Sequence, residues 1–237
     1  MIGSLYSPAS DHGAIPEIFG REEELAALKS VIVPGGAALI LGPKGIGKTA
    51  LLSAAQRVAS QAGFATGRAA TTDRNDVTLA RLLESLGVPL AARMGSRALE
   101  RELLRWCDAH HCALFLDDAD RANVGLLHTL RRVVLESSAC TVAAARTGPA
   151  DAPDRLRRAV FPTKEVRLGP LSPAAARSLA RAAGVPPGLV KEVVRRSGRV
   201  PVAVVEMARR HRYMRYQIGG RVSWDLLLAD LRLSNRL

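Results

Sequence analysis

The sequence of 237 residues predicts an α/β fold, with a five-stranded, mostly parallel sheet followed by a small helical unit. Short apolar runs, typical of buried parallel strands, alternate along the chain with segments of helical periodicity. A glycine-rich loop at residues 42–49 joins one of these runs to a helix. From Gly169 onward only helical patterns remain, so we expect the sheet to end there and a small bundle of helices to follow.

The first half of the sheet unit is predicted from three patterns. Residues 21–30 form an amphipathic helix, because Leu25 and Leu28 are apolar and acidic residues fill its first turn. Residues 37–41 are an apolar strand, and residues 50–59 after the glycine-rich loop return to helical spacing. A second strand is expected at residues 64–70, where alternation resumes.

The second half continues the alternation. Helices are expected at 77–86 and 96–109, and in the latter Leu99, Leu103 and Trp106 share one face. Asp120 is the predicted N-cap of a helix at 121–137. Strands are expected at 112–116, 140–145 and 166–168. Because strands alternate with helices, the crossovers should be right-handed and the sheet parallel.

The helical unit begins at a clear boundary signal. Ser172 is the predicted N-cap and Pro173 the first residue of a helix at 173–183. Two more helices are expected at 187–197 and 200–211, and Gly219-Gly220 signals a hairpin beyond them. The chain therefore divides into a flexible N-terminal extension (1–16), a core (17–168), a helical lid (169–212) and a basic C-terminal tail (213–237).

The loop at 42–49 carries the most specific chemistry. Its residues, Gly42-Pro43-Lys44-Gly45-Ile46-Gly47-Lys48-Thr49, satisfy G-x-x-x-x-G-K-[ST] at every specified position. Glycines let the backbone curl so that successive N–H groups face an anion, and the following helix adds the positive end of its dipole. Lys48 is then expected to reach the β- and γ-phosphates of a nucleotide, and the Thr49 hydroxyl to ligate Mg²⁺. A chance glycine-rich turn is the alternative.

The composition indicates which kinds of partner and which compartment to expect. The net charge is +12, and residues 195–237 hold ten arginines against three acidic residues, which favours acidic partners such as nucleotides or nucleic acid. The three cysteines form no C-x-x-C motif, so we expect buried thiols rather than disulfides or a zinc site. With no signal-peptide pattern and no apolar run long enough for a bilayer, the sequence predicts a cytoplasmic protein without a membrane partner.

Two carboxylates end the apolar run at 112–116. Asp117 is the predicted Mg²⁺ ligand, because a carboxylate at the end of a strand beside a phosphate loop can hold the ion directly or through water. Asp118 points elsewhere and is the predicted residue that orients the attacking water. The alternative is that Asp118 is a structural carboxylate and that hydrolysis is slow.

Arginines are the remaining candidates for phosphoryl transfer. Arg146, at the end of the strand at 140–145, is placed to sense the γ-phosphate. Arg155, Arg157 or Arg158 would supply an arginine finger to a neighbouring copy of the chain. For any one of these three, a solvated helix face is the alternative. The histidines at 110, 111 and 128 are interpreted as ordinary surface or capping residues.

Taken together, Phe19-Gly20-Arg21-Glu22, the loop at 42–49, Leu114–Asp118, Arg146 and Val166–Pro173 resemble the P-loop NTPase core of AAA+ ATPases, with the signal-transduction (STAND) and origin-recognition branches most similar. The resemblance covers residues 17–211 and implies ATP and Mg²⁺ as cofactors. It places Ile18 and Phe19 against adenine, Arg146 at the sensor position and Pro201 as a lid contact. The expected nucleotide-binding residues are Ile18, Phe19, Gly42, Pro43, Lys44, Gly45, Ile46, Gly47, Lys48, Thr49, Ala50 and Pro201; the catalytic residues are Asp118, Lys48 and Arg146; the metal ligands are Thr49 and Asp117.

Two departures from the family pattern stand out. Arg199 occupies the position where the second glycine of the lid motif is expected, and no winged helix or repeat array follows the lid. The chain is therefore interpreted as a fragment, or as a minimal ATPase whose output comes from a protein partner or from self-association.

Three functions remain open at this point. The first is an ATP-driven, Mg²⁺-dependent switch or assembly factor. The second is a DNA-binding AAA+ regulator, similar to those of transposition, that assembles on duplex DNA through the arginine-rich stretch at 209–216. The third is a kinase with a small acceptor, which the box at 19–22 and the lid disfavour.

Overall fold

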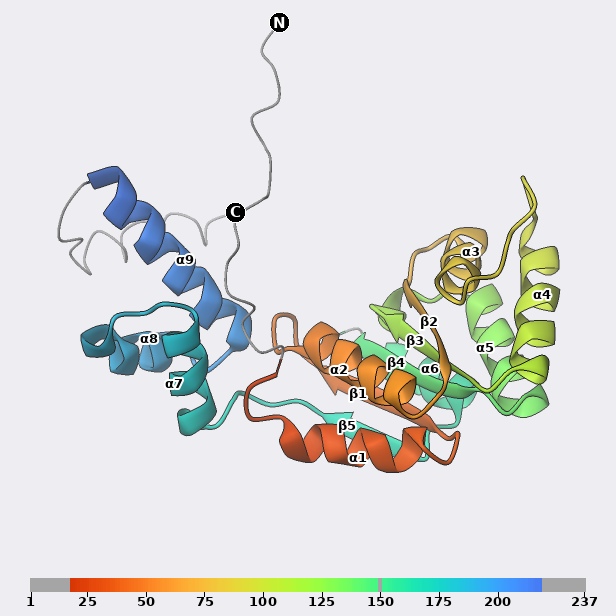
Figure 1. Ribbon diagram of the computed structural model, residues 1–237, viewed down its shortest axis with the longest axis horizontal. Helices are drawn as coiled ribbons and strands as arrows, with labels where there is room; N and C mark the ends of the chain where they lie inside the picture. Colours follow the sequence, from red (N-terminus) through yellow and green to blue (C-terminus); the bar gives the residue numbers. More distant parts are fainter. Residues whose placement is uncertain (1–17, 149–150, 219–237) are drawn as a thin grey trace, which may run out of the picture.

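The computed structural model describes residues 18–148 and 151–218, and its core is a five-stranded sheet in which every neighbouring pair of strands is parallel (Figure 1). The strand order is β2-β3-β4-β1-β5. The strands are β1 (Ala37–Gly42), β2 (Ala65–Ala70), β3 (Cys112–Asp117), β4 (Cys140–Arg146) and β5 (Lys164–Arg167). The predicted five-stranded α/β fold is therefore confirmed, and the sheet is parallel throughout.

Burial along the strands follows their position in the sheet. β1 and β3 are buried at every residue, whereas the edge strands β2 and β5 are partly exposed. The apolar residues are consecutive in β1 and β3 because helices cover both faces of a parallel sheet, so side chains on both faces are buried. The register sets Gly42 opposite Arg146 and Ala70 opposite Asp117, so the carboxyl ends of β1, β4, β2 and β3 meet at one edge.

Within the part of the chain that the structure describes, six helices flank the sheet in two layers. They are α1 (Glu22–Ile32), α2 (Lys48–Gln61), α3 (Asn75–Ser85), α4 (Ser96–Ala109), α5 (Val124–Glu136) and α6 (Ala152–Val160). Leu28 of α1 and Leu52 of α2 pack with Phe115 on one face. Residues of α3 to α6, among them Leu103 and Leu130, pack with the opposite face. The result is a three-layer core with a separate hydrophobic cluster on each side of the sheet.

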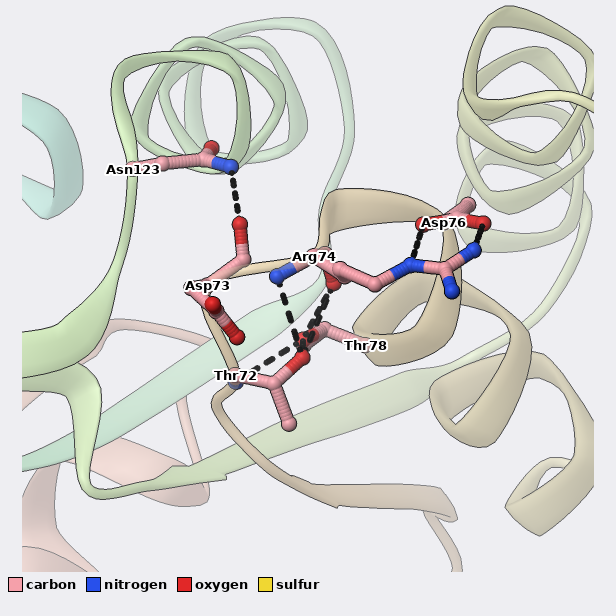
Figure 2. A network of polar contacts seen from close by, with 6 residues as sticks. All are labelled: Thr72, Asp73, Arg74, Asp76, Thr78 and Asn123. Carbon is pink, nitrogen blue, oxygen red and sulfur yellow. Dashed lines mark hydrogen bonds and ion pairs between the residues drawn. The ribbon is translucent and has the colours of Figure 1, made fainter.

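The N-cap predicted for α5 is wrong. Asn123 caps that helix, since its side-chain oxygen accepts a hydrogen bond from the Leu126 N–H at 2.9 Å. The chain first makes a 3₁₀ turn over Ala119–Arg121, so Asp120 lies too early to cap the helix. The Asn123 amide also donates to the backbone carbonyl of Asp73 at 2.9 Å, which ties α5 to the loop after β2 (Figure 2).

The lid is a small bundle of helices that lies beyond the carboxyl edge of the sheet (Figure 1). It contains α7 (Pro173–Ala182), α8 (Val190–Arg196) and α9 (Pro201–Ile218), with a 3₁₀ turn at Pro187–Leu189. Leu179, Val193 and Val204 belong to its own hydrophobic cluster. As predicted, Ser172 caps α7 by accepting a hydrogen bond from Ala175 N–H at 3.1 Å, with Pro173 at the first helical position.

Helix α9 continues through Ile218, across the boundary expected between residues 212 and 213. The predicted extension at 1–16 and hairpin at Gly219-Gly220 lie outside the described residues.

The three cysteines are all buried and unpaired, as the sequence predicts. Burial raises the pKa of the Cys140 thiol to about 12, so this sulfur stays protonated at neutral pH.

Among the helices in the part of the chain that the structure describes, none has the length and apolar character required to cross a bilayer.

Candidate functional site

A cavity of about 690 Å³ lies between the carboxyl edge of the sheet and the lid. Core and lid both contribute to its walls, so it is a site that neither part forms alone. Of the predicted nucleotide-binding residues, Gly42 and Pro43 do not line it and the rest do. Its lining is Ile18, Phe19, Arg21, Lys44, Gly45, Ile46, Gly47, Lys48, Thr49, Ala50, Leu51, Ser53, Asp118, Arg146, Leu171, Leu179, Pro201, Val202 and Val205.

The glycine-rich loop between β1 and α2 has the backbone that its sequence predicts. Gly45 and Gly47 have φ values of 78° and 102°, in the left-handed region that suits glycine. Such residues turn neighbouring N–H groups toward one side and make a concavity for an anion. Gly42 serves a different purpose, because a Cβ there would lie 2.8 Å from Ile46 Cγ2. The loop is thus both curled and closely packed.

Lys48 folds back over this loop. Its Nζ donates hydrogen bonds to the carbonyl oxygens of Gly42 and Pro43, both at 2.9 Å. Burial lowers the pKa of Lys48 below its usual 10.5, while the nearby Asp120 and Asp118 act in the opposite direction. The ammonium group is therefore held at the loop that it would serve.

Asp117 and Asp118 have different environments. The Asp117 side chain, at the end of β3, is 11% exposed and lies 3.6 Å from Nη2 of Arg68 on β2. Arg68 also donates to Ser53 Oγ at 2.6 Å, and that hydroxyl donates to the Thr49 carbonyl. Asp118 has a left-handed φ of 47°, which turns its side chain to the cavity wall. The two adjacent carboxylates thus face different groups.

Arg146 lies at the end of β4, on the cavity wall. Its guanidinium is 3.8 Å from Asp118 and 3.6 Å from Asp120. Asp120 also accepts the backbone N–H of Arg146 at 3.0 Å, and its side chain is 6% exposed. Sequence reasoning missed Asp120 as a residue that positions Arg146. Its acidic character and closeness to Asp118 were the only available signal.

Much of the remaining cavity wall is apolar. Ile18 packs with a core cluster, and Phe19 packs with the lid cluster. Leu171, Leu179, Pro201 and Val205 line the cavity from the lid side. Apolar walls of this kind are typical of small-molecule sites.

Arg199 itself adopts a left-handed φ of 63°. The position thus has the backbone that suits the glycine expected there, although it carries an arginine.

The three arginines considered as trans fingers lie on α6 and do not line the cavity. Arg157 is paired with Glu165 and Asp154, and Arg155 lies 3.2 Å from Asp151. Arg158 is exposed, and its Nε donates to the Asp154 carbonyl at 3.3 Å. Two of the three are therefore engaged with carboxylates of their own chain.

The two predicted metal ligands differ in position. Thr49 lines the cavity, whereas Asp117 is buried at the end of β3 and does not line it. Hydroxyl and carboxylate oxygens are hard ligands of the kind that Mg²⁺ prefers. No group of three or more histidine, cysteine or acidic side chains suited to a metal occurs within residues 18–148 and 151–218.

A family model described as "AAA ATPase domain" matches residues 17–183, which is more than half of the chain. No curated protein matches the sequence.

Solved structures with a similar fold include the following three. Orc1 of Aeropyrum pernix, solved in complex with DNA, superposes with a TM-score of 0.69 at 18% identity, over 92% of this chain and 66% of that one. Domain III of the replication initiation protein DnaA of Thermotoga maritima gives 0.66 at 17%, over 94% and 98%. The RuvB Holliday junction branch migration motor of Thermotoga maritima gives 0.59 at 16%, over 91% and 70%. The chain thus spans slightly less than two thirds of the Orc1 chain.

Proposed function

The chain belongs to the AAA ATPase domain family, and we propose that it binds ATP with Mg²⁺ and acts as a nucleotide-driven molecular switch or assembly factor. The observation that carries this proposal is the cavity that core and lid build together. A ligand that contacts both core and lid binds best to the arrangement in which both contacts are made. It therefore favours that relative position of core and lid. With its three free thiols, the protein is suited to a reducing cytoplasm.

In the proposed complex, the base lies between Ile18, Phe19 and Pro201, and the phosphate chain lies on the loop at 42–49. Lys48 leaves the carbonyls of Gly42 and Pro43 and donates to phosphate oxygens. Charge-assisted hydrogen bonds of this kind contribute about 1.5–3 kcal/mol each, so a few of them are enough for micromolar binding. Thr49 and Asp117 would hold Mg²⁺, which neutralises charge on the phosphate oxygens when bound.

For hydrolysis we propose three residue roles. Asp118 orients a water molecule at the γ-phosphorus and accepts its proton as the new P–O bond forms and the bond to the ADP oxygen breaks. Lys48 and Arg146 donate hydrogen bonds to the oxygens on which negative charge builds up. Asp120 holds Arg146 in place through its backbone N–H and its guanidinium.

The test of nucleotide binding is a calorimetric titration with ADP and Mg²⁺. The Lys48→Ala variant should bind at least about 100-fold more weakly, because it loses several charge-assisted bonds. Lys29→Ala is the matched control, since Lys29 is exposed on α1 away from the cavity. Equal affinity in wild type and Lys48→Ala would refute the proposed site.

Self-association is part of the same proposal. Of the three candidate finger arginines, Arg158 is the one best suited to reach a neighbouring copy, since it is exposed and, in the part of the chain that the structure describes, forms no ion pair with a carboxylate. A finger supplied in trans typically accelerates hydrolysis about 10³–10⁵-fold. The ATPase rate per chain should therefore rise with protein concentration in wild type and stay flat in Arg158→Ala.

Assembly on duplex DNA is the second candidate function. Its supporting observation is the charge of the lid: residues 169–212 carry nine basic and two acidic side chains, and α9 extends as a helix into the arginine-rich stretch. Arginine suits phosphate recognition because its planar fork can donate two parallel bonds.

The DNA candidate is tested by fluorescence anisotropy with a labelled duplex at several salt concentrations. Arg177 and Arg181 lie one turn apart on the exposed side of α7, and Arg97 and Arg101 have the same spacing on α4. Neutralising the α7 pair to glutamine should weaken binding and flatten its salt dependence, whereas neutralising the α4 pair should not. Absence of salt-sensitive binding in wild type would rule this function out.

A further inference from the structure

The segment before α1 joins the core to the lid. Ile18 packs with the core cluster and Phe19 with the lid cluster. Gly20 has a φ of 59°, and a Cβ built on it would lie 2.3 Å from the Cβ of Ala175 on α7. The chain therefore passes directly against the lid at this residue, which only glycine allows.

Arg21 ends this segment with a buried guanidinium. Arg21 is 8% exposed, and it lies on the cavity wall. Its Nη1 donates to Glu24 Oε1 at 2.7 Å, and its Nη2 donates to the carbonyl oxygen of Gly169 and, at 3.5 Å, to that of Ile46. Ile46 belongs to the glycine-rich loop at 42–49, called the phosphate loop from here on, and Gly169 belongs to the linker between β5 and α7. One guanidinium thus connects three segments that are far apart in the sequence.

The bond to Ile46 is part of a wider pattern in the phosphate loop. The Gly42 and Pro43 carbonyls accept from Lys48, and the Gly45 carbonyl accepts the Val202 N–H of α9 at 3.2 Å. Four carbonyls of the loop therefore accept hydrogen bonds: two from Lys48 of the loop itself, one from Arg21 and one from the lid. Fixing the carbonyl of a peptide unit also fixes the direction of its N–H, because the unit is planar.

We propose that Arg21 is a positioning residue that couples the phosphate loop to the core–lid linker, so that the position of the lid sets the affinity of the loop for phosphate. The inference rests on the proposed nucleotide site. It adds a connection between the lid and the phosphate loop that does not require the base of a nucleotide. When the lid is docked, the Arg21–Gly169 and Val202–Gly45 bonds hold the loop ready for an anion. When the lid moves away, both are lost and the loop amides lose their fixed direction.

The residue type suits this role. Arginine remains charged and has five N–H donors in a rigid plane, so it can serve a carboxylate and two carbonyl groups at once. Lysine at this position would keep the charge but not the planar fork. Glutamine would keep donors but lose both the charge and the reach.

The experiment separates the phosphate part of the site from the base part. Inorganic triphosphate and adenosine each compete with a fluorescent ADP analogue on wild type, Arg21→Lys, Arg21→Gln and the matched control Arg81→Gln, which alters an exposed arginine of α3. Arg21→Gln should weaken inorganic triphosphate about tenfold or more, as expected for the loss of a charged hydrogen-bonding group. Arg21→Lys should be intermediate, and Arg81→Gln should match wild type.

Hydrogen exchange gives a readout that needs no variant. Inorganic triphosphate bound to wild type should slow exchange at the amides of linker residues 169 and 171, although the triphosphate contains no base to touch the lid side. This measurement holds even if Arg21→Gln fails to fold.

Two results would overturn the inference. The first is an unchanged affinity for triphosphate in a folded Arg21→Gln protein. The second is a hydrogen-exchange rate of the linker amides that does not change when triphosphate binds. Failure of wild type to bind the ADP analogue would instead count against the proposed nucleotide site itself, so the two failures are distinguishable.

Discussion

The surroundings of Lys48 set its hydrogen bonds and lower its pKa before any ligand binds. It is buried, donates to two carbonyls of its own loop and lies close to acidic residues of the neighbouring strands. Burial is the largest of these influences and lowers the pKa of Lys48. A bound phosphate would favour the charged form again, so nucleotide affinity and proton binding are linked at this residue.

The first prediction concerns pH. ADP affinity should fall as pH rises toward 10.5, beginning at a lower pH than for an ordinary lysine, because the free protein loses the Lys48 proton early. Over the same window the unfolded chain binds the proton more tightly, so the Lys48 contribution to the free energy of unfolding rises with pH. Titrations between pH 7 and 10.5 check this, with Lys48→Arg as the variant whose affinity should not fall in that range.

The second prediction concerns metal dependence. Arg68 lies 3.6 Å from the Asp117 carboxylate, so it would compete with Mg²⁺ for this predicted ligand. Arg68→Met keeps the apolar stem and removes the charge. The Mg²⁺ concentration for half-maximal ADP binding should fall about fivefold, since a partly exposed ion pair is worth about 1 kcal/mol at most. An unchanged or higher requirement would show that Arg68 does not compete.

At the scale of elements, the site depends on three segments that approach one another closely. The phosphate loop meets the N-terminus of α9 through the bond from Val202 N to Gly45 O. The segment at 18–21 lies against α7 at Gly20 and reaches the loop through the Arg21 side chain. A Cβ on Gly45 would lie 2.2 Å from Val202 Cγ1. Lid docking is thus set by small residues and backbone hydrogen bonds as well as by side-chain packing.

The third prediction tests this close approach. Gly20→Ala introduces a left-handed alanine, at a cost of about 1–2 kcal/mol, and a clash with Ala175. ADP affinity and thermal stability should both fall. Adding Ala175→Gly removes the clash but not the backbone strain, so it should restore part of the affinity. Ala174→Gly, at an exposed position of the same helix, is the control and should restore nothing.

At the scale of the whole molecule, the sheet presents its carboxyl edge to the lid (Figure 1). Residues of both parts line the cavity. Ligands of open α/β sheets bind at the carboxyl ends of the strands, at the point where the strand order reverses direction. In this sheet that point is at β1, which lies between β4 and β5. In the proposed complex the core and the lid would contact the same nucleotide, so binding energy could be converted into a change of shape or of assembly.

The fourth prediction concerns that change. Light scattering with ADP, a slowly hydrolysed ATP analogue, or duplex DNA should show a larger mass with the ATP analogue than with ADP. Arg158→Ala should keep the mass seen with ADP and assemble less with the ATP analogue. A mass that is independent of all three ligands would argue against an assembly factor.

Much of this molecule was predictable because its signals are local. The phosphate loop, the strand that ends at Asp117 and the Ser172 cap each follow from a few adjacent residues, since strand, turn and helix preferences act over short distances. The parallel sheet followed from their alternation. The same reasoning failed at Asp120, where a short 3₁₀ turn delays α5 to Asn123.

The contacts that shape the site were decided by the tertiary structure alone. Arg21 meets a carbonyl 148 residues away, and Arg68 meets Asp117 only because β2 and β3 are neighbours in the sheet. No periodicity or motif encodes such pairs, because they depend on how separately formed elements pack. The sequence by itself therefore determined which loop carries the phosphate-binding motif, and packing determined which distant side chains and which part of the lid contact that loop.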